Sequence, residues 1–215
     1  MVKKRKETLG VLQKGFLKEE YRTLCANLSE YRVDAKLREA RKSVLAFVTG
    51  LRFSALLIYR MRKILKNTNL KADWGAIIDD TGKKCSPECD IIVHDDGSIY
   101  EWNGDDDVGG RVMDFHFIHQ QNVRLVISCK SCVTQIDRNM KDDIVKLADY
   151  VENVWLFAEC CEAKQVPKLR RDAKNAGYKK FYYLYLLKKG SVTPQDERVW
   201  FRFAQSLQGL AAKEQ

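Results

Sequence analysis

The 215-residue sequence predicts an α/β fold built on a mixed central sheet. Three observations support this prediction. Helical spacing of apolar residues dominates residues 1–67, short strands and tight turns follow over 74–102, and strands then alternate with helices as far as residue 210. Tight turns join antiparallel strands, whereas helical crossovers join parallel ones, so this order predicts both kinds of pairing in one sheet.

The first of these regions is predicted to be helical, in two or three segments. In the first segment, apolar residues with the i, i+3, i+7, i+8 spacing of one helix face are Leu9, Leu12, Phe16 and Leu17. A further helix covers residues 46–65, and a hinge rich in Asn and Asp over 67–73 ends it. We divide the chain into a basic helical arm, 1–45, and an α/β domain, 46–215.

The middle region predicts an antiparallel meander. Its expected strands are 74–78, 89–94 and 98–102. Asp and Gly residues at 80–82 and 95–97 are typical of the turns that join such strands, and 103–110 is predicted to be a loop.

The last region alternates strands with helices. The expected strands are 123–129, 154–158 and 181–187, and the expected helices are 137–153, 166–176 and 199–210. The strand at 123–129 is the clearest, because its nearly continuous β-branched and apolar residues are typical of a buried strand. Gly177 suits the end of one helix and Pro194 the start of another.

Composition narrows the class of protein. Hydrophobic residues make up 45% of the chain and charged residues 31%, as expected for a globular protein with a core. No run of about 18 uncharged apolar residues occurs, which argues against a membrane-spanning helix. No apolar segment follows the basic start, and the seven cysteines, an odd number, are interpreted as reduced thiols, so we expect a cytoplasmic protein.

Charge is unevenly distributed along the chain. Residues 1–72 hold 18 Lys and Arg against 6 Asp and Glu, residues 73–120 hold 3 against 12, and residues 121–215 hold 17 against 11. An acidic centre between two basic segments suggests a polyanionic partner held around a carboxylate site. A solvated helix face is the alternative for any one segment, and the arm at 1–45 also fits self-association.

Asp90 and Lys130 form the central candidate site. Asp90 opens one expected strand and Lys130 ends the most buried one, so the two side chains can meet where neighbouring strands end. Mg²⁺ binds one or two carboxylates together with phosphate oxygens, and a nearby lysine can orient water or stabilise charge developing on a phosphate. A turn aspartate and a strand-end lysine with no shared role are the alternative.

With this pair and this order of elements, the chain resembles the PD-(D/E)xK nuclease superfamily, which has the restriction-endonuclease-like fold, and within it a bacterial branch. The matching segments are Gly50-Leu51-Arg52, Asp79 to Gly82, Ser86, Asp90-Ile91-Ile92-Val93 and Val126-Ile127-Ser128-Cys129-Lys130-Ser131. The resemblance covers about residues 45–187. It implies that Asp90 binds the metal and that Lys130 is the catalytic lysine.

The sequence departs from this superfamily at two positions. Ser128 stands where the glutamate of the ExK motif is expected, and Phe53 stands where the branch often has a glutamate on its first helix. Some members of the superfamily have Ser-x-Lys, with the carboxylate moved to the following helix. Asp143 matches that position, with Asp142 beside it and Glu88 as a second candidate. The alternative is that both aspartates only favour the start of a helix.

The resemblance implies a metal-dependent nuclease that uses Mg²⁺ or Mn²⁺ to hydrolyse DNA or RNA, with double-stranded DNA as the expected substrate and a homodimer as the expected assembly. Asp90, Lys130 and Ser128 would be catalytic, and Asp90, Asp143 and Glu88 would bind the metal. The basic residues expected to contact nucleic acid are Arg52, Arg60, Lys63, Lys168, Arg170, Arg171 and Lys174. The missing glutamate supports an alternative, a catalytically degenerate member that binds nucleic acid or serves regulation or assembly.

Other metal-ligating residue types have weaker patterns. Four cysteines have spacings compatible with zinc: Cys85, Cys89, Cys129 and Cys132. Alternation along the strands places Cys89 and Cys129 on the buried face, opposite the candidate site, so free thiols are the simpler interpretation. His116 and His119 could contact substrate or metal, although histidines in such positions more often belong to the core or to a sheet edge.

Overall fold

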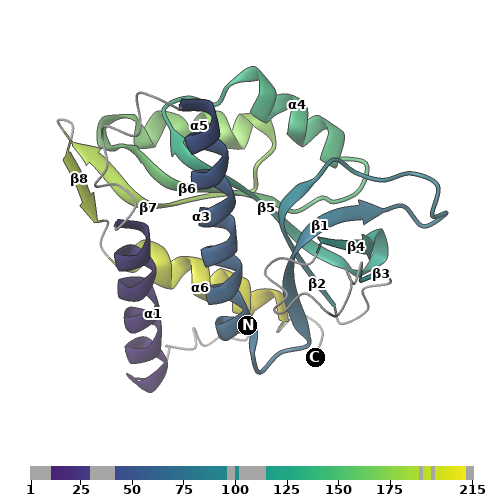
Figure 1. The fold of residues 1–215 in the computed structure, drawn as a ribbon, viewed down its shortest axis with the longest axis horizontal. Coiled ribbons are helices and arrows are strands. Elements are labelled where there is room, and N and C mark those ends of the chain that lie inside the picture. The colour runs from purple at the N-terminus through teal and green to yellow at the C-terminus, as the bar shows by residue number, and fades with distance from the viewer. Residues whose placement is uncertain are drawn as a thin grey trace, which may run out of the picture.

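The computed structural model describes residues 11–29, 42–95, 100–101, 115–188, 191–194 and 197–211. Its strands are β1 (Leu70–Ile78), β2 (Cys89–Asp95), β3 (Tyr100–Glu101), β4 (Phe115–His119), β5 (Val123–Val133), β6 (Val154–Glu162), β7 (Lys180–Lys188) and β8 (Ser191–Pro194). Its α-helices are α1 (Val11–Ser29), α3 (Lys42–Leu65), α4 (Arg138–Leu147), α5 (Val166–Ala176) and α6 (Arg198–Ala211). The strands form one eight-stranded sheet in the order β3-β4-β1-β2-β5-β6-β7-β8 (Figure 1).

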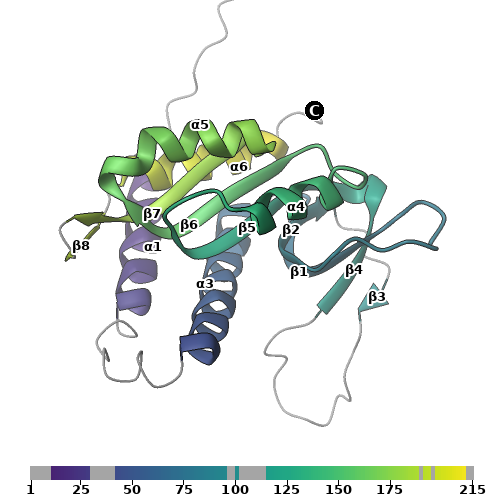
Figure 2. The ribbon, with the colours of Figure 1, turned by 90° about the horizontal axis from the view of Figure 1, so that it is seen from above.

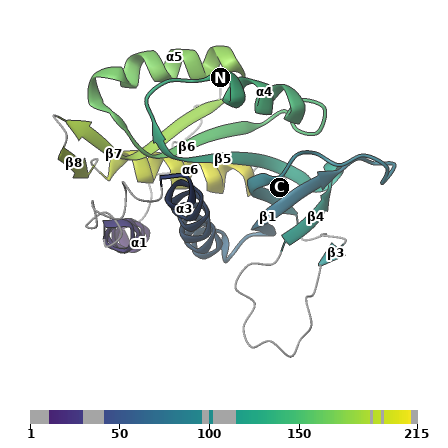
Figure 3. The same ribbon diagram turned by 45° about the horizontal axis from the view of Figure 1, so that its top comes forward.

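The sheet is mixed, as the sequence predicts. β2 pairs antiparallel with both β1 and β5, whereas β5, β6 and β7 run parallel to one another. The two parallel connections pass through α4 and α5, which lie on the same face of the sheet (Figures 2 and 3). Helical crossovers account for these two parallel pairs. The predicted three-strand meander is only partly correct, because β1 also pairs parallel with β4 and β3 pairs with β4 instead of β2.

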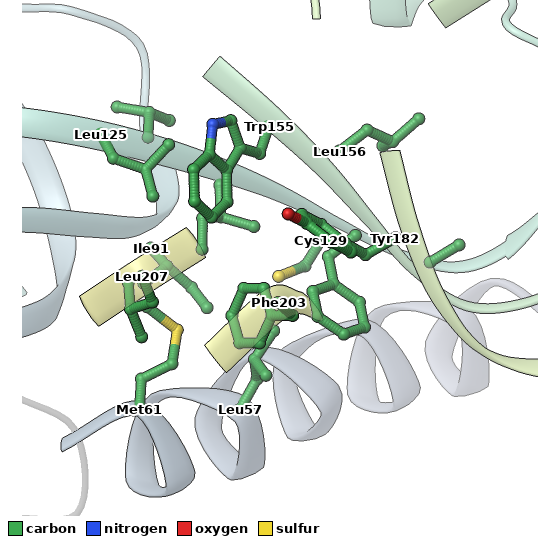
Figure 4. Packing of buried hydrophobic residues seen from close by; sticks show 14 of the residues in the cluster. Leu57, Met61, Ile91, Leu125, Cys129, Trp155, Leu156, Tyr182, Phe203 and Leu207 are labelled. Atoms are coloured by element: carbon green, nitrogen blue, oxygen red, sulfur yellow. The ribbon is translucent and has the colours of Figure 1, made fainter. Parts of the chain in front are cut away.

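The other face of the sheet is covered by α3 and α6 (Figure 3). The centre of the core lies between these helices and the middle strands, where Phe157 meets Phe203 edge to face at 4.8 Å between ring centroids. Figure 4 shows Leu57 and Met61 of α3 pointing toward the same cluster. Large aromatic side chains supply much buried area for each ordered residue, so this layer fixes how α6 sits on the sheet.

Helix α1 packs against both α3 and α6. Its buried side chains include Leu17, Tyr21 and Leu24, and the Tyr21 hydroxyl reaches the Leu184 carbonyl of β7 at 3.4 Å. The boundary predicted at 45/46 falls inside α3, and residues 1–10 and 30–41 of the predicted arm lie outside the described residues. None of the helices in the described part of the chain is both long enough and apolar enough to cross a membrane.

Two predicted element boundaries are wrong. The expected hinge at 67–73 overlaps β1, which starts at Leu70 because Leu70 and Ala72 face the core while Lys71 between them faces solvent. The expected helix at 137–153 ends at Leu147. In both cases the packing of a buried face has more influence than local composition on where the element begins or ends.

Two strands were not predicted by the sequence. β4 alternates partly buried aromatic residues with the buried His116 and Ile118, a strand pattern obscured by its histidines. Pro194 ends the edge strand β8 instead of starting a helix, which is possible because an edge position tolerates a residue without an N–H group. The strand expected at 98–102 is described only as β3, and the loop expected at 103–110 lies outside the described residues.

A buried ionic network ties α3 to the first strands of the sheet. Asp73, 5% exposed, accepts hydrogen bonds from Arg62 and, at 2.8 Å, from Nε2 of the fully buried His94. The Nδ1 atom of His94 faces the Asp95 carbonyl at 2.6 Å, so both ring nitrogens face acceptors. Burial alone would raise the pKa of Asp73, but the hydrogen bonds from His94 and Arg62 and the Arg62 charge outweigh it and lower that pKa to about 2.

Gly75 allows β1 and β4 to approach each other closely. A Cβ atom at this position would lie 1.9 Å from the His116 carbonyl oxygen, which is backbone and cannot rotate away. The β1–β2 register also shifts between Asp73 and Gly75, as at a β-bulge. The glycine therefore allows β1 to pass close to β4 at the point where its register with β2 shifts.

We predict that Asp73→Ala destabilises the protein by about 3–5 kcal/mol at pH 7, the range for removing one partner of a buried ion pair. Because the folded-state pKa of Asp73 is lowered, its contribution is present above the unfolded value near 3.9 and is lost as the pH falls toward 2. Urea unfolding from pH 7 to pH 3 measures this difference. Asp80→Ala, at an exposed turn residue, is the control and should change stability by less than about 0.5 kcal/mol.

Candidate active site

The candidate active site lies where β2 and β5 separate. Their ladder ends at the pair Ile91 and Ile127. Beyond it, the backbone N–H of Cys129 donates to Oδ2 of Asp90 at 2.8 Å, so a carboxylate replaces the next backbone acceptor. This fork holds Asp90 directly beside the strand segment that presents Lys130.

A cavity of about 330 Å³ opens at this fork. Its charged lining residues are Glu88, Asp90, Lys130 and Asp143, and Ser128 also lines it. The sequence predicted each of these five as a site residue, and the structure brings them together around one cavity. They come from β5, α4, β2 and the segment immediately before β2, so the site depends on correct docking of the α4 crossover.

Negative charge exceeds positive charge in this cavity. Burial raises the pKa of Asp90, the Cys129 N–H and the Lys130 charge oppose that rise, and Glu88 and Asp143 add to it. Three carboxylates facing one lysine repel one another in a partly desolvated space. A divalent cation would relieve this repulsion, which makes the set chemically suited to bind one.

The number of side chains available to bind a metal ion in this cavity is limited. Within the described ranges, no group of three or more His, Cys, Asp or Glu residues is placed to hold a metal by itself. Mg²⁺ does not require such a group, since one or two carboxylates, waters and substrate phosphate oxygens complete its octahedron. The residues fit Mg²⁺ or Mn²⁺ held by Asp90 with one further carboxylate, and they do not fit a closed structural site.

The four cysteines considered for zinc form no such group among the described residues. Cys89 and Cys129 are buried, as alternation predicts, while Cys85 and Cys132 are exposed. Burial raises the pKa of Cys89 to about 12, which disfavours the thiolate that zinc requires. The six cysteines that the structure describes are free thiols.

Asp143 and Asp142 occupy different environments on α4. Asp143 lines the cavity, whereas Asp142 is exposed and faces Arg138 at 3.7 Å. The cap of this helix is Asp137, which accepts the Met140 N–H at 2.9 Å, so the two aspartates lie beyond the first turn. Stabilisation of the helix start therefore does not explain them, and of the two only Asp143 lines the cavity.

Two aromatic residues of the cavity were not predicted as site residues. The Trp74 indole N–H donates to Oε1 of Glu88 at 2.7 Å and so orients that carboxylate. Tyr178 is buried beside Ser128, where burial raises its pKa to about 12 and a hydrogen bond with Ser128 opposes that rise. Tyr178 follows Gly177, the left-handed cap of α5, and its position between basic residues suggested only base stacking or packing.

The predicted nucleic-acid contacts divide into two groups. Lys168, Arg170, Arg171 and Lys174 are all exposed on α5. Arg60, in contrast, is 4% exposed and forms an ion pair with Glu20 of α1 at 2.7 Å, so it cannot reach a phosphate at the surface. Lys63 also contacts Glu20, at 3.2 Å, while Arg52 is partly exposed on α3 next to the cavity residue Leu51.

Comparisons with known proteins show similarity of fold and little similarity of sequence. No family model and no curated protein matches the chain. Among solved structures, it is similar to cAAA-bound NucC of P. aeruginosa ATCC27853, with TM-score 0.61 and 11% identity over 94% of this chain and 92% of that one. For NucC of E. coli MS115-1, the cAAA-bound form gives TM-score 0.57, 10% identity and coverage of 95% and 93%, and the apo form gives 0.53, 11% and coverage of 93% and 92%. The shared architecture is the restriction-endonuclease-like fold, as the sequence resemblance implied.

We predict that Asp90→Asn stabilises the metal-free protein at pH 7.5 in EDTA. Burial raises the pKa of Asp90 in the folded state, so its ionised form opposes folding above that pKa, and the opposition disappears below the unfolded value near 3.9. Each kcal/mol gained would raise Tm by about 2–4 °C for a chain of this size. Thermal scans at pH 7.5 and pH 4 measure the difference, with the exposed Asp142→Asn as control.

Added Mg²⁺ or Mn²⁺ should then raise the Tm of the wild type more than that of Asp90→Asn. A variant that melts below the wild type in EDTA at pH 7.5 would show that Asp90 is a structural residue.

Proposed function

We propose that this protein is a metal-dependent nuclease that hydrolyses the phosphodiester bonds of DNA. The observation that carries the proposal is the fork cavity, which gathers Asp90, Lys130 and Asp143 on a restriction-endonuclease-like fold. The fold match to NucC supports a nuclease function, and the chemistry of the cavity supports it independently.

Each charged group of the cavity has a distinct part in this reaction. Asp90, with Asp143 or Glu88, would hold Mg²⁺ or Mn²⁺, which when bound supplies charge neutralisation for the phosphate and activation of water. The Lys130 ammonium orients the attacking water and stabilises the negative charge that builds on the phosphate oxygens. The Cys129 N–H keeps Asp90 in place while this charge develops, since its hydrogen bond is part of the fold.

Substrate class follows from charge and fold. Exposed basic side chains on α5 provide contacts for a phosphate backbone, and the fold match to NucC supports a nucleic-acid substrate. We propose double-stranded DNA as the preferred substrate and RNA as the alternative. Cutting both strands requires two active sites, so we propose a homodimer as the smallest active assembly, acting in a reducing cytoplasm that keeps the cysteines free.

A second function is favoured by one observation. Ser128 occupies the position of the ExK glutamate, and the described residues contain no group of three metal-ligand side chains. A catalytically degenerate protein that only binds nucleic acid, or serves regulation or assembly, would show both features. It would bind DNA with a steep salt dependence but would not turn over.

A plasmid-nicking assay with Mg²⁺ or Mn²⁺ tests the nuclease proposal. We expect Lys130→Met and Asp90→Asn to lower cleavage by about 10²–10³-fold, as for removal of one group that stabilises transition-state charge. Asp143→Asn should lower it strongly, whereas Asp142→Asn, its neighbour on the same helix, should leave it within about twofold.

If the pure wild type cleaves neither DNA nor RNA with either metal ion, the catalytic proposal is wrong. Salt-dependent DNA binding that survives Asp90→Asn would then favour the degenerate protein. Equal effects of Asp142→Asn and Asp143→Asn would instead contradict the assignment of Asp143 as the second carboxylate.

A further inference from the structure

A second cavity lies away from the fork, at the edge of the sheet between α5 and α6. Its volume is about 430 Å³, within the range typical of ligand sites. We call it the α5–α6 groove; its lining includes Arg170 of α5, Lys180 and Phe181 of β7, and Arg202 and Ser206 of α6. Three cations line it and, among the described residues, no Asp or Glu does.

The groove exists because the last strand is short. β8 pairs with β7 only over Tyr185–Lys188, so no described strand covers the beginning of β7 on that side. Helices α5 and α6 lie on opposite faces of the sheet (Figure 3), and the groove crosses the sheet edge between them. Cations from both faces therefore converge on one opening, which no single helix surface could achieve.

Polar groups inside the groove are oriented by neighbouring residues. The Tyr182 hydroxyl donates to Oγ of Ser206 at 2.9 Å, which leaves the Ser206 hydrogen available for an acceptor in the groove. The Lys180 ammonium lies 4.4 Å from the centre of the Trp155 ring, and the Arg202 Nε donates to the Arg198 carbonyl at 3.3 Å. These contacts hold the cationic side chains, which lowers the entropy lost when an anion binds.

The positive charge continues from the groove along α5. Lys168, Arg171 and Lys174 are exposed on this helix, and Asp172 is its only acidic residue, facing Arg171 at 3.5 Å. A small anion would need only the groove. Several cations spread over the groove and the exposed surface of this helix fit a partner with repeated negative charges, as the phosphates of a nucleic acid provide.

Helix α5 also connects the groove to the fork cavity. Arg170 in the helix lines the groove, and Tyr178, two residues beyond its last residue, Ala176, lines the fork cavity. An 11-residue helix is about 16 Å long. At about 3.4 Å for each nucleotide along one strand, the length of this helix corresponds to about five nucleotides.

We propose that the α5–α6 groove binds the sugar-phosphate backbone of the nucleic acid a few nucleotides from the bond that is cleaved. The inference rests on the proposed function for the identity of the polyanion, but it concerns a different cavity and different residues. The groove contributes affinity and orients the strand relative to the fork, and it takes no part in the chemical step.

Binding measured without metal tests this inference separately from cleavage. Fluorescence anisotropy of labelled duplex and single-stranded DNA, with the full chain in EDTA, gives Kd as a function of salt between about 50 and 200 mM. For Arg170→Gln/Arg202→Gln we expect at least tenfold weaker binding, and a salt slope for duplex lowered by about 1.8, or about 0.9 for each phosphate that an arginine no longer neutralises. The charge-retaining Arg170→Lys/Arg202→Lys should keep most of the slope.

The matched control is Lys66→Gln/Lys71→Gln, which removes the same charge from exposed residues outside the groove and should change Kd by less than about twofold. Equal losses of affinity in both double variants, or wild-type binding by the groove variant, would overturn the inference. Displacement of DNA by inorganic phosphate at comparable concentration would also overturn it and indicate a small-anion site. DNA binding that depends on the groove, without cleavage, contradicts only the catalytic proposal, and intact cleavage with a dispensable groove contradicts only this inference.

Discussion

The hydrogen bond from the Cys129 N–H to the Asp90 carboxylate is the interaction on which the candidate site depends. It forms where the β2–β5 ladder ends at Ile91 and Ile127, and it substitutes a side chain for the backbone acceptor that a continued ladder would supply. The two strands can therefore separate without leaving a buried donor unpaired. Their separation opens the cavity, and the same bond fixes the carboxylate within reach of Lys130.

Two buried or partly buried aspartates illustrate how environment divides structural from chemical roles. Asp73 is surrounded by donors, and His94 and Arg62 hold its pKa at about 2 despite burial. Asp90 has one backbone donor and one lysine, while burial and two other carboxylates raise its pKa. The negative charge of Asp73 is therefore stabilised by the protein's own donors without any ligand. That of Asp90 remains electrostatically unfavourable until a cation or substrate arrives, which is the condition expected of a binding site.

Sequence reasoning predicted the mixed sheet from the order of the elements. It named Asp90 and Lys130 as candidates from their positions at strand ends and Asp143 from the family resemblance, and all three line one cavity. It did not predict β4, whose histidines obscure a strand pattern, or the burial of Arg60, which depends on the docking of α1 through Glu20. Trp74 reaches the cavity through a β-bulge beside Gly75, and a bulge changes side-chain direction in a way that alternation does not anticipate. The features that sequence reasoning missed depend on contacts between elements that are distant in sequence.

The fork also affects the order of events during folding. Asp90 and Cys129 are 39 residues apart, so their bond closes a long loop, whereas the β1–β2 meander and the α4 crossover are built from contacts closer in sequence. Contacts that close long loops form slowly, because chain entropy must be lost before they contribute. The cavity is therefore complete only when segments as far apart in sequence as Gly50 and Tyr178 have come together.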